Sequence, residues 1–100
     1  MLYLILGHDG SDALPRRAAT RPAHLDYVRA LQEQGRLIIA GPRPRLETSQ
    51  PGEAGFHGSL IIAEFDSLDA ARAWASNDPY ARAGVFERVD VQPFVRVLPA

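Results

Sequence analysis

The order of the strand and helix signals constrains this chain more than any other feature of its sequence. Residues 2–7 are apolar on both faces of an extended segment, which predicts a first strand. Two further apolar runs, at residues 36–41 and 59–65, predict the second and third strands. Valines alternate with polar residues from 89 to 97, which predicts a half-buried fourth strand with Pro93 at an edge or bulge.

A segment with helical periodicity separates the first two of these strands. Pro22 lies near its beginning, and a proline inside a helix removes a backbone donor. We therefore expect the helix to start loosely near Arg16, to become regular after Thr20, and to end at Gly35. Its apolar stripe consists of His24, Tyr27, Val28 and Leu31.

A second helix follows the third strand, and a long loop precedes that strand. Ser67 can cap the helix, whose stripe would be Leu68, Ala71, Trp74 and Ala75. Asp78 before Pro79 is a typical start for one further helical turn, closed by Gly84. The loop at residues 42–58 has no periodicity, so we expect it to be mobile and to border a ligand cleft.

The resulting order, β-α-β-β-α-β, is the split βαβ arrangement of ferredoxin-like α+β domains. A chain of 100 residues is the size of one such domain, residues 1–100. Two helices can cover one face of the antiparallel sheet, whereas strands one and three are apolar on both faces. The second face would leave a large apolar patch in water, so the pattern predicts a homodimer joined through the sheet.

Composition excludes several classes of function. The formal net charge is −1, from 11 basic residues, all of them arginine, and 12 acidic residues. We therefore expect neither nucleic acid nor a membrane surface as a partner. The absence of cysteine excludes disulfides and thiolate chemistry, and the first apolar run is too short for a signal or a membrane span. We expect a small cytoplasmic protein without a cofactor.

His24 is the most informative candidate for a functional residue. It lies in the middle of an apolar helical stripe and should point inward. It is either a core histidine satisfied by the backbone or a carboxylate, or an acid–base residue that titrates near neutral pH. Arg21 lies three residues earlier on nearly the same face, where it could anchor an anionic ligand or lie on the surface.

The remaining candidates carry weaker signals. Helix capping alone explains Asp78, and the coarse topology does not place it beside His24. Ser59 could be a turn residue or a ligand hydroxyl, and Tyr80 a packed aromatic with its hydroxyl at the surface. A metal site formed by His8, His24, His57 and Asp78 stays open as an alternative, but no spacing matches a metal motif, so we expect none.

Several short segments, taken in their order and spacing, resemble the YCII-related family. They are RPAHL at 21–25, GRL at 35–37, AGP at 40–42, GS at 58–59, AWA at 73–75 and DPY at 78–80, followed by Gly84. The resemblance covers nearly the whole chain. It implies a ferredoxin-like protomer in a dimeric α+β barrel, and an active-site cleft centred on His24 and Asp78.

Two hypotheses for function follow. In the first, His24 acts as general base or acid and Asp78 holds its tautomer, for proton abstraction, isomerisation or elimination on a small acid. Arg21, together with Arg17, would anchor the anionic group, and Ser59 or Tyr80 would complete the hydrogen bonding. In the second, the protein is a non-catalytic dimeric module that binds a small ligand or a partner, and the histidine and the aspartate are buried architecture.

Overall fold

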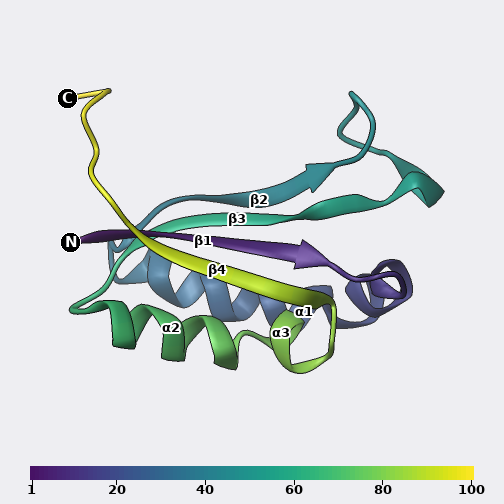
Figure 1. Cartoon of the computed structure of the whole chain (residues 1–100), viewed down its shortest axis with the longest axis horizontal. Coiled ribbons are helices and arrows are strands. Elements are labelled where there is room, and N and C mark those ends of the chain that lie inside the picture. Colours follow the sequence, from purple (N-terminus) through teal and green to yellow (C-terminus); the bar gives the residue numbers. More distant parts are fainter.

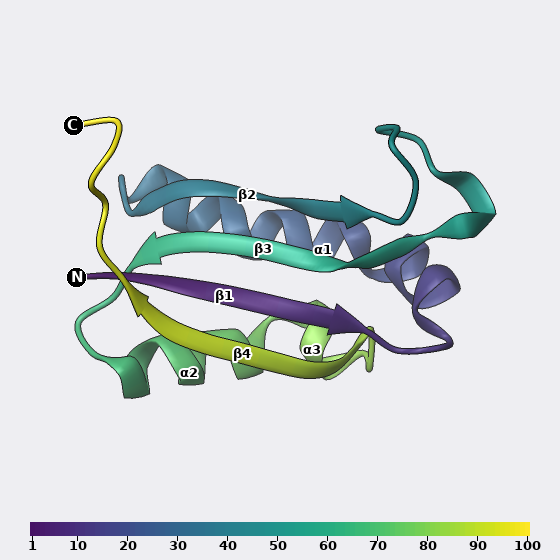
Figure 2. The same cartoon turned by 45° about the horizontal axis from the view of Figure 1, so that its top comes forward.

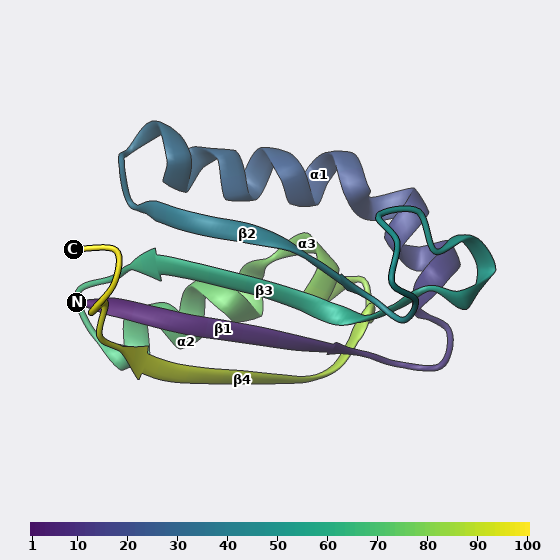
Figure 3. The ribbon, with the colours of Figure 1, turned by 90° about the horizontal axis from the view of Figure 1, so that it is seen from above.

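The computed structural model describes residues 1–100, and it contains one antiparallel sheet with the three α-helices on one face (Figures 1 and 3). The strand order is β2-β3-β1-β4, which confirms the ferredoxin-like α+β class (Figure 2). The elements in chain order are β1 Leu2–Asp9, α1 Ala13–Glu33, β2 Leu37–Pro44, the short 3-10 helix η1 Gly52–Ala54, β3 Phe56–Glu64, α2 Leu68–Asn77, α3 Pro79–Arg82 and β4 Phe86–Phe94.

The core lies between the sheet and the helices. Side chains alternate along β1 between the two faces, so that Tyr3 and Ile5 point toward the helices and are buried. From the other layer, Val28 and Leu31 of α1 reach the same core, at the spacing that places side chains on one face of a helix. The cluster also contains Ile61, Ala63, Phe65, Ala71 and Ala75.

The first helix begins earlier than its prolines predict. It starts at Ala13 rather than near Arg16 or Thr20, and it contains Pro22 in its interior. Pro15 lies in the first turn, where a backbone N–H has no helical partner to lose. Ala18 and Pro22 are both exposed, so water can reach the carbonyl that the proline leaves without a donor. The early start adds Arg17 to the buried face of the helix.

The strand boundaries also differ from the predicted ones, because pairing decides them. The fourth strand covers Phe86–Phe94 instead of 89–97 and ends where Phe94 pairs with Leu2, the first residue of β1. Beyond that point the alternating valines have no strand to pair with. It is an edge strand, as Pro93 predicts.

The long loop is shorter than predicted, because β2 extends to Pro44 and β3 begins at Phe56. It covers residues 45–55. That this loop is mobile stays a prediction, which amide hydrogen exchange can test.

The predicted caps are confirmed. The Ser67 hydroxyl accepts a hydrogen bond from the Ala70 N–H at 3.0 Å, as a helix N-cap does. Gly35 ends α1 with a φ of 71°, a conformation that residues with a Cβ rarely adopt. None of the helices combines the length and the apolar character needed to cross a bilayer.

The face of the sheet opposite the helices carries apolar side chains that no element of this chain covers. Leu4 of β1 and Leu60 and Ile62 of β3 are only half-buried on this face. Ile39 of β2 is 56% exposed beside them. This is the second apolar face of the sheet that the strand pattern predicts.

Candidate functional site

A cavity of about 260 Å³ lies between α1 and the sheet, next to α3. Its wall is mostly apolar, and the polar side chains on it come from α1, β3 and α3. Six residues are candidates for the site from the sequence, and all of them except Asp78 line this cavity. The five that line it are Arg17, Arg21, His24, Ser59 and Tyr80.

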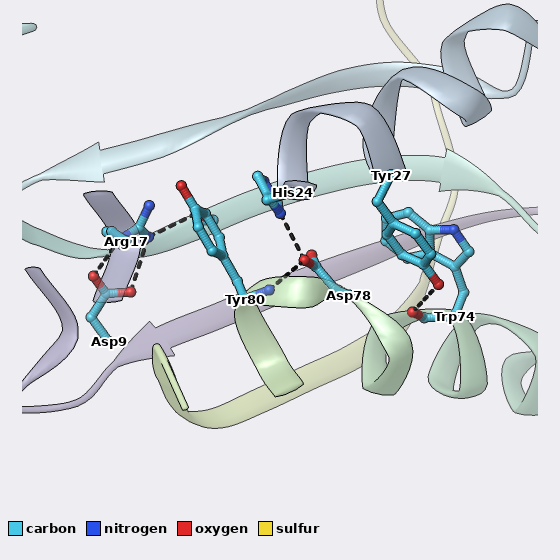
Figure 4. A network of polar contacts seen from close by, with 8 residues as sticks. Asp9, Arg17, His24, Tyr27, Trp74, Asp78 and Tyr80 are labelled. Carbon is cyan, nitrogen blue, oxygen red and sulfur yellow. Dashed lines mark hydrogen bonds and ion pairs between the residues drawn. The ribbon is translucent and has the colours of Figure 1, made fainter. Parts of the chain in front are cut away.

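His24 and Asp78 are in contact, contrary to the coarse topology expected from the sequence. The imidazole Nδ1 lies 2.7 Å from Oδ1 of Asp78, and both residues are buried (Figure 4). An ionised carboxylate can only accept hydrogen bonds, so Nδ1 is the donor of this bond, and in the neutral imidazole Nε2 is the nitrogen that carries the lone pair. No residue of the chain is bonded to Nε2, and His24 lines the cavity.

Asp78 has a second bond that explains the helical turn after it. Its Oδ1 also accepts the backbone N–H of Tyr80 at 2.9 Å, which makes it the N-cap of α3. Asp78 therefore both caps α3 and contacts His24, and one oxygen atom makes both hydrogen bonds.

The aromatic ring of Tyr80 lies flat against the imidazole. The two ring centroids are 3.8 Å apart and the planes differ by 10°. The residue is only 3% exposed, so it is not a surface tyrosine. Burial raises the pKa of the Tyr80 phenol above its usual value of 10.0, while the charge of Arg17 acts in the opposite direction. The phenol is therefore protonated at neutral pH.

Arg17 is held on the other side of Tyr80 by a buried carboxylate that sequence reasoning missed. Its Nε and Nη2 both donate to the carboxylate of Asp9, the Nη2 bond being 2.9 Å long, and Nη2 also donates to the Ser59 hydroxyl at 2.8 Å. Arg17 is 6% exposed and Asp9 8% exposed. A bidentate pair of this kind fixes the orientation of the guanidinium plane.

Aromatic rings complete the surroundings of this guanidinium. Its central carbon lies 4.9 Å from the ring centroids of Phe56 and Tyr80 and 5.9 Å from that of Phe86. Phe86 can approach because Gly7 faces it on β1, and a Cβ at that position would lie 2.7 Å from the ring. Arg17 is thus immobilised before any ligand arrives.

Three polar groups at the cavity have donor or acceptor capacity that the chain leaves unused: Nε2 of His24, the O–H of Tyr80, which has no acceptor although Arg17 acts on its oxygen, and Nη1 of Arg17. None of them is sealed from solvent, because the only buried side-chain nitrogen or oxygen without a partner is Nε of Arg43. Arg21 adds a fourth group, since it is exposed and lines the cavity without a hydrogen bond. The cavity is therefore apolar in its wall and polar at a few convergent points, as small-molecule sites usually are.

A second stacked pair, Tyr27 and Trp74, lies outside the cavity, on the far side of Asp78 (Figure 4). The ring centroids are 4.7 Å apart, and the Tyr27 hydroxyl donates to the backbone carbonyl of Trp74 at 2.8 Å. Burial, and after it the charge of Asp78, raise the pKa of Tyr27. This phenol is already satisfied, unlike that of Tyr80.

The other histidines lie away from the cavity. His8 points to the opposite face of the sheet, where its Nε2 lies 2.9 Å from Asp90, and His57 is exposed. No three histidine, aspartate or glutamate side chains come together as a set that could hold a metal ion. The four-residue metal alternative is therefore not assembled in the fold.

Asp9 could have been found from its position. It is the last residue of β1, at the same parity as Tyr3 and Ile5, which places its side chain on the helix face of the sheet. A carboxylate on a face that is otherwise buried requires a cation, and the only arginine on the buried face of α1 is Arg17. The prolines predict a later start of regular helix, so Arg17 is not recognised from the sequence as part of the buried face.

Comparison with known protein sequences identifies relatives that match most of this chain. Protein YciI of Escherichia coli O6:H1 is 53% identical over 97 residues, which are 97% of this chain and 99% of that protein. Derivative of benzaldehyde biosynthesis cluster protein C of Emericella nidulans is 35% identical over 83 residues, 82% of this chain and 85% of that protein.

Among solved structures, one similar chain is the 5-chloro-2-hydroxyhydroquinone dehydrochlorinase of Burkholderia phenoliruptrix AC1100, in complex with 2,5-dihydroxybenzoquinone. It superposes with a TM-score of 0.84 at 29% identity, over 97% of this chain and 96% of that one. The family model described as the YCII-related domain matches residues 1–95. With this match over nearly its whole length, the chain belongs to the YCII-related domain family.

Proposed function

We propose that the protein is an acid–base enzyme acting on a small anionic molecule, with His24 as the base and Asp78 as the residue that holds it. The observation that carries this proposal is the 2.7 Å contact between Nδ1 of His24 and the buried carboxylate, which leaves Nε2 free at the cavity. A histidine satisfied only as core architecture has no reason to present its second nitrogen to an apolar cavity.

The chemistry available to this pair is proton transfer. Nε2 accepts a proton from a substrate hydroxyl, or from a carbon next to a carbonyl, and the electron pair left behind forms a new double bond. In an elimination, a leaving group then departs with the electrons of its own bond. The imidazolium that forms is stabilised by the negative charge of Asp78, and it can return the proton in an isomerisation.

The charges around the cavity support an anionic substrate. Arg21 is exposed beside the cavity, and Arg17 presents one free nitrogen inside it. Arginine forks suit carboxylates and other oxyanions, and the apolar wall suits the carbon skeleton that carries the charge. Ser59 contributes through Arg17, because its hydroxyl accepts a hydrogen bond from Nη2 of that arginine.

The similar dehydrochlorinase supports the choice of substrate class. Its name describes the loss of chloride from a chlorinated hydroxyhydroquinone, and its bound molecule is 2,5-dihydroxybenzoquinone. An elimination of this kind needs a base and a site for a small oxygenated ring. We therefore propose small hydroxylated quinones and hydroquinones as the first compounds to test on this chain.

The test is proton exchange and chloride release by the purified chain. Solvent deuterium should enter the carbon next to the carbonyl of a hydroxyquinone, or chloride should be released from a chlorohydroquinone, and His24→Ala should abolish both. His57→Ala is the matched control, because this histidine is exposed and lies outside the cavity. Binding of the ring without exchange or release would contradict catalysis and favour the non-catalytic module.

We also propose that two copies associate through the open face of the sheet. The half-buried leucines and isoleucines of β1 and β3 on that face support this, because no helix or loop of the same chain covers them. A second copy supplies a face of the same apolar character.

A further inference from the structure

We propose that the Tyr80 hydroxyl and Nη1 of Arg17 together bind the substrate oxygen on which negative charge develops, opposite the His24 base. This inference rests on the proposed function and adds an oxyanion-binding pair to it. It also narrows the substrate class to molecules that pass through an enolate or phenolate, as distinct from simple carboxylates.

The first observation is the order of the side chains across the cavity. Tyr80 lies between the two charged pairs, with the imidazole of His24 stacked on its ring and the guanidinium of Arg17 4.9 Å from its centroid. Figure 4 shows the hydroxyl pointing away from Asp78, on the side where Arg17 lies. A base and an anion-binding group thus face the same cavity from the two sides of one aromatic ring.

The second observation is that both donors are fixed and close to each other. Nε and Nη2 of Arg17 are already bonded to Asp9 and Ser59, which leaves Nη1 as the donor available to a ligand. Tyr80 is 3% exposed, its backbone N–H is bonded to Asp78, and the guanidinium of Arg17 interacts with its phenol oxygen, while the phenol O–H has no acceptor in the chain. Donors that are fixed before the reaction stabilise developing charge without a cost of reorganisation.

The third observation concerns the protonation state. Burial keeps the phenol protonated at neutral pH, and a neutral phenol can donate a hydrogen bond, whereas a phenolate cannot. The charge of Arg17 next to it favours the phenolate and so makes the phenol a stronger donor. Asp9 is then a positioning residue, because it acts on the substrate only through the orientation of Arg17.

The substrate class follows from the geometry. The ring face of Tyr80 toward His24 is occupied by the imidazole, so the substrate meets this residue through its hydroxyl rather than by stacking. When the base removes the proton of a ring hydroxyl conjugated with a carbonyl, the electron pair of the O–H bond is delocalised onto the carbonyl oxygen, where a phenol and a guanidinium can bind the negative charge. This arrangement favours hydroxyquinones and related enols, in which an oxygen and an acidic hydrogen lie on one small ring.

The experiment compares two phenol deletions. Tyr80→Phe keeps the ring stacked on His24 and removes only the hydroxyl, and Tyr27→Phe is the matched control, because that stacked phenol lies outside the cavity and donates to the Trp74 carbonyl. Binding of 2,5-dihydroxybenzoquinone is measured by calorimetry. We expect a dissociation constant about 10- to 100-fold weaker for Tyr80→Phe, as for one hydrogen bond to a charged group. Tyr27→Phe should stay within about twofold of wild type.

A second measurement does not depend on a variant that folds. With ¹³C label at the tyrosine Cζ, the Tyr80 resonance should move when 2,5-dihydroxybenzoquinone is added, while the Tyr27 resonance should not. Unchanged affinity of Tyr80→Phe, or an unmoved Tyr80 resonance with bound probe, would overturn the oxyanion pair and leave the His24 base standing. A wild-type chain that does not bind the probe would overturn both the pair and the proposed substrate class.

Discussion

Removal of the Asp78 carboxylate is the perturbation whose consequences the structure defines best. Oδ1 of Asp78 accepts two hydrogen bonds, from Nδ1 of His24 at 2.7 Å and from the Tyr80 backbone at 2.9 Å. Asp78→Ala removes this oxygen, and with it both hydrogen bonds, at a residue that is 2% exposed. Each of the two donors then lies in the interior without a partner, at about 1–3 kcal/mol per group.

These contributions predict a loss of about 2–6 kcal/mol in the free energy of unfolding for Asp78→Ala. Asp78→Asn keeps an oxygen at the same position and can preserve both bonds. It loses only the part that comes from the negative charge, about 1 kcal/mol. In a chain of this size each kcal/mol lowers Tm by about 4–8 °C.

Urea denaturation followed by circular dichroism measures these differences. Asp26→Ala is the matched control, because the Asp26 side chain is 79% exposed and its pair with Arg29, at 3.4 Å, should contribute no more than about 0.5 kcal/mol. The ¹⁵N chemical shifts of His24 add a direct test, since loss of the carboxylate should release the imidazole from the tautomer with hydrogen on Nδ1. The reasoning would be refuted if the Asp78→Ala variant were as stable as the Asp26→Ala variant and its His24 kept the same tautomer.

Three further outcomes are expected. Asp9→Ala leaves the Arg17 cation buried without a counter-charge and should lower the free energy of unfolding by about 3–5 kcal/mol in urea. The raised pKa values of Tyr27 and Tyr80 mean that the unfolded chain loses its phenol protons first, so the stability they contribute is complete below pH 10.0 and declines above it. The double variant Tyr27→Phe, Tyr80→Phe should lose less stability above pH 10.0, which melting curves recorded at alkaline pH measure. Sedimentation at micromolar concentration should give twice the 11.0 kDa chain mass, and Leu4→Asp on the open sheet face should give the monomer; a monomeric wild type would contradict the sheet-to-sheet dimer.

The order of the elements was predictable because the hydrophobic periodicity of each segment reflects the face that it buries. The ends of the elements were not, because they depend on partners far away in sequence. The fourth strand stops at Phe94, since β1 offers no residue before Leu2 to pair with it, although the alternation of valines continues. The prolines of α1 were misleading for a different reason. Their cost depends on whether the affected backbone groups are in the first turn or within reach of water, and a sequence does not show this.

The meeting of His24 and Asp78 follows from the topology once the helix boundaries are known. The strands β1 and β3 are antiparallel neighbours, so the helices that follow them, α1 and α2, run in opposite directions on the same face (Figure 3). Tyr27 reaches Trp74 across this pair of segments. Three residues earlier in α1 is His24, and four residues later, beyond the end of α2, is Asp78.

This spacing is one turn of a helix along each partner, so the contact of His24 with Asp78 is the next step of the same antiparallel packing. The N-cap position of Asp78 therefore also places its carboxylate beside α1, which the local capping signal in the sequence does not show. Because α2 ends after ten residues while α1 continues for 21, the break at Asn77 brings a carboxylate to the middle of a longer helix, where a histidine replaces an apolar residue of the stripe. A helix end beside the middle of another helix therefore makes an ordinary N-cap the hydrogen-bond partner of a buried histidine, and the same short helix α3 carries Tyr80 into the cavity.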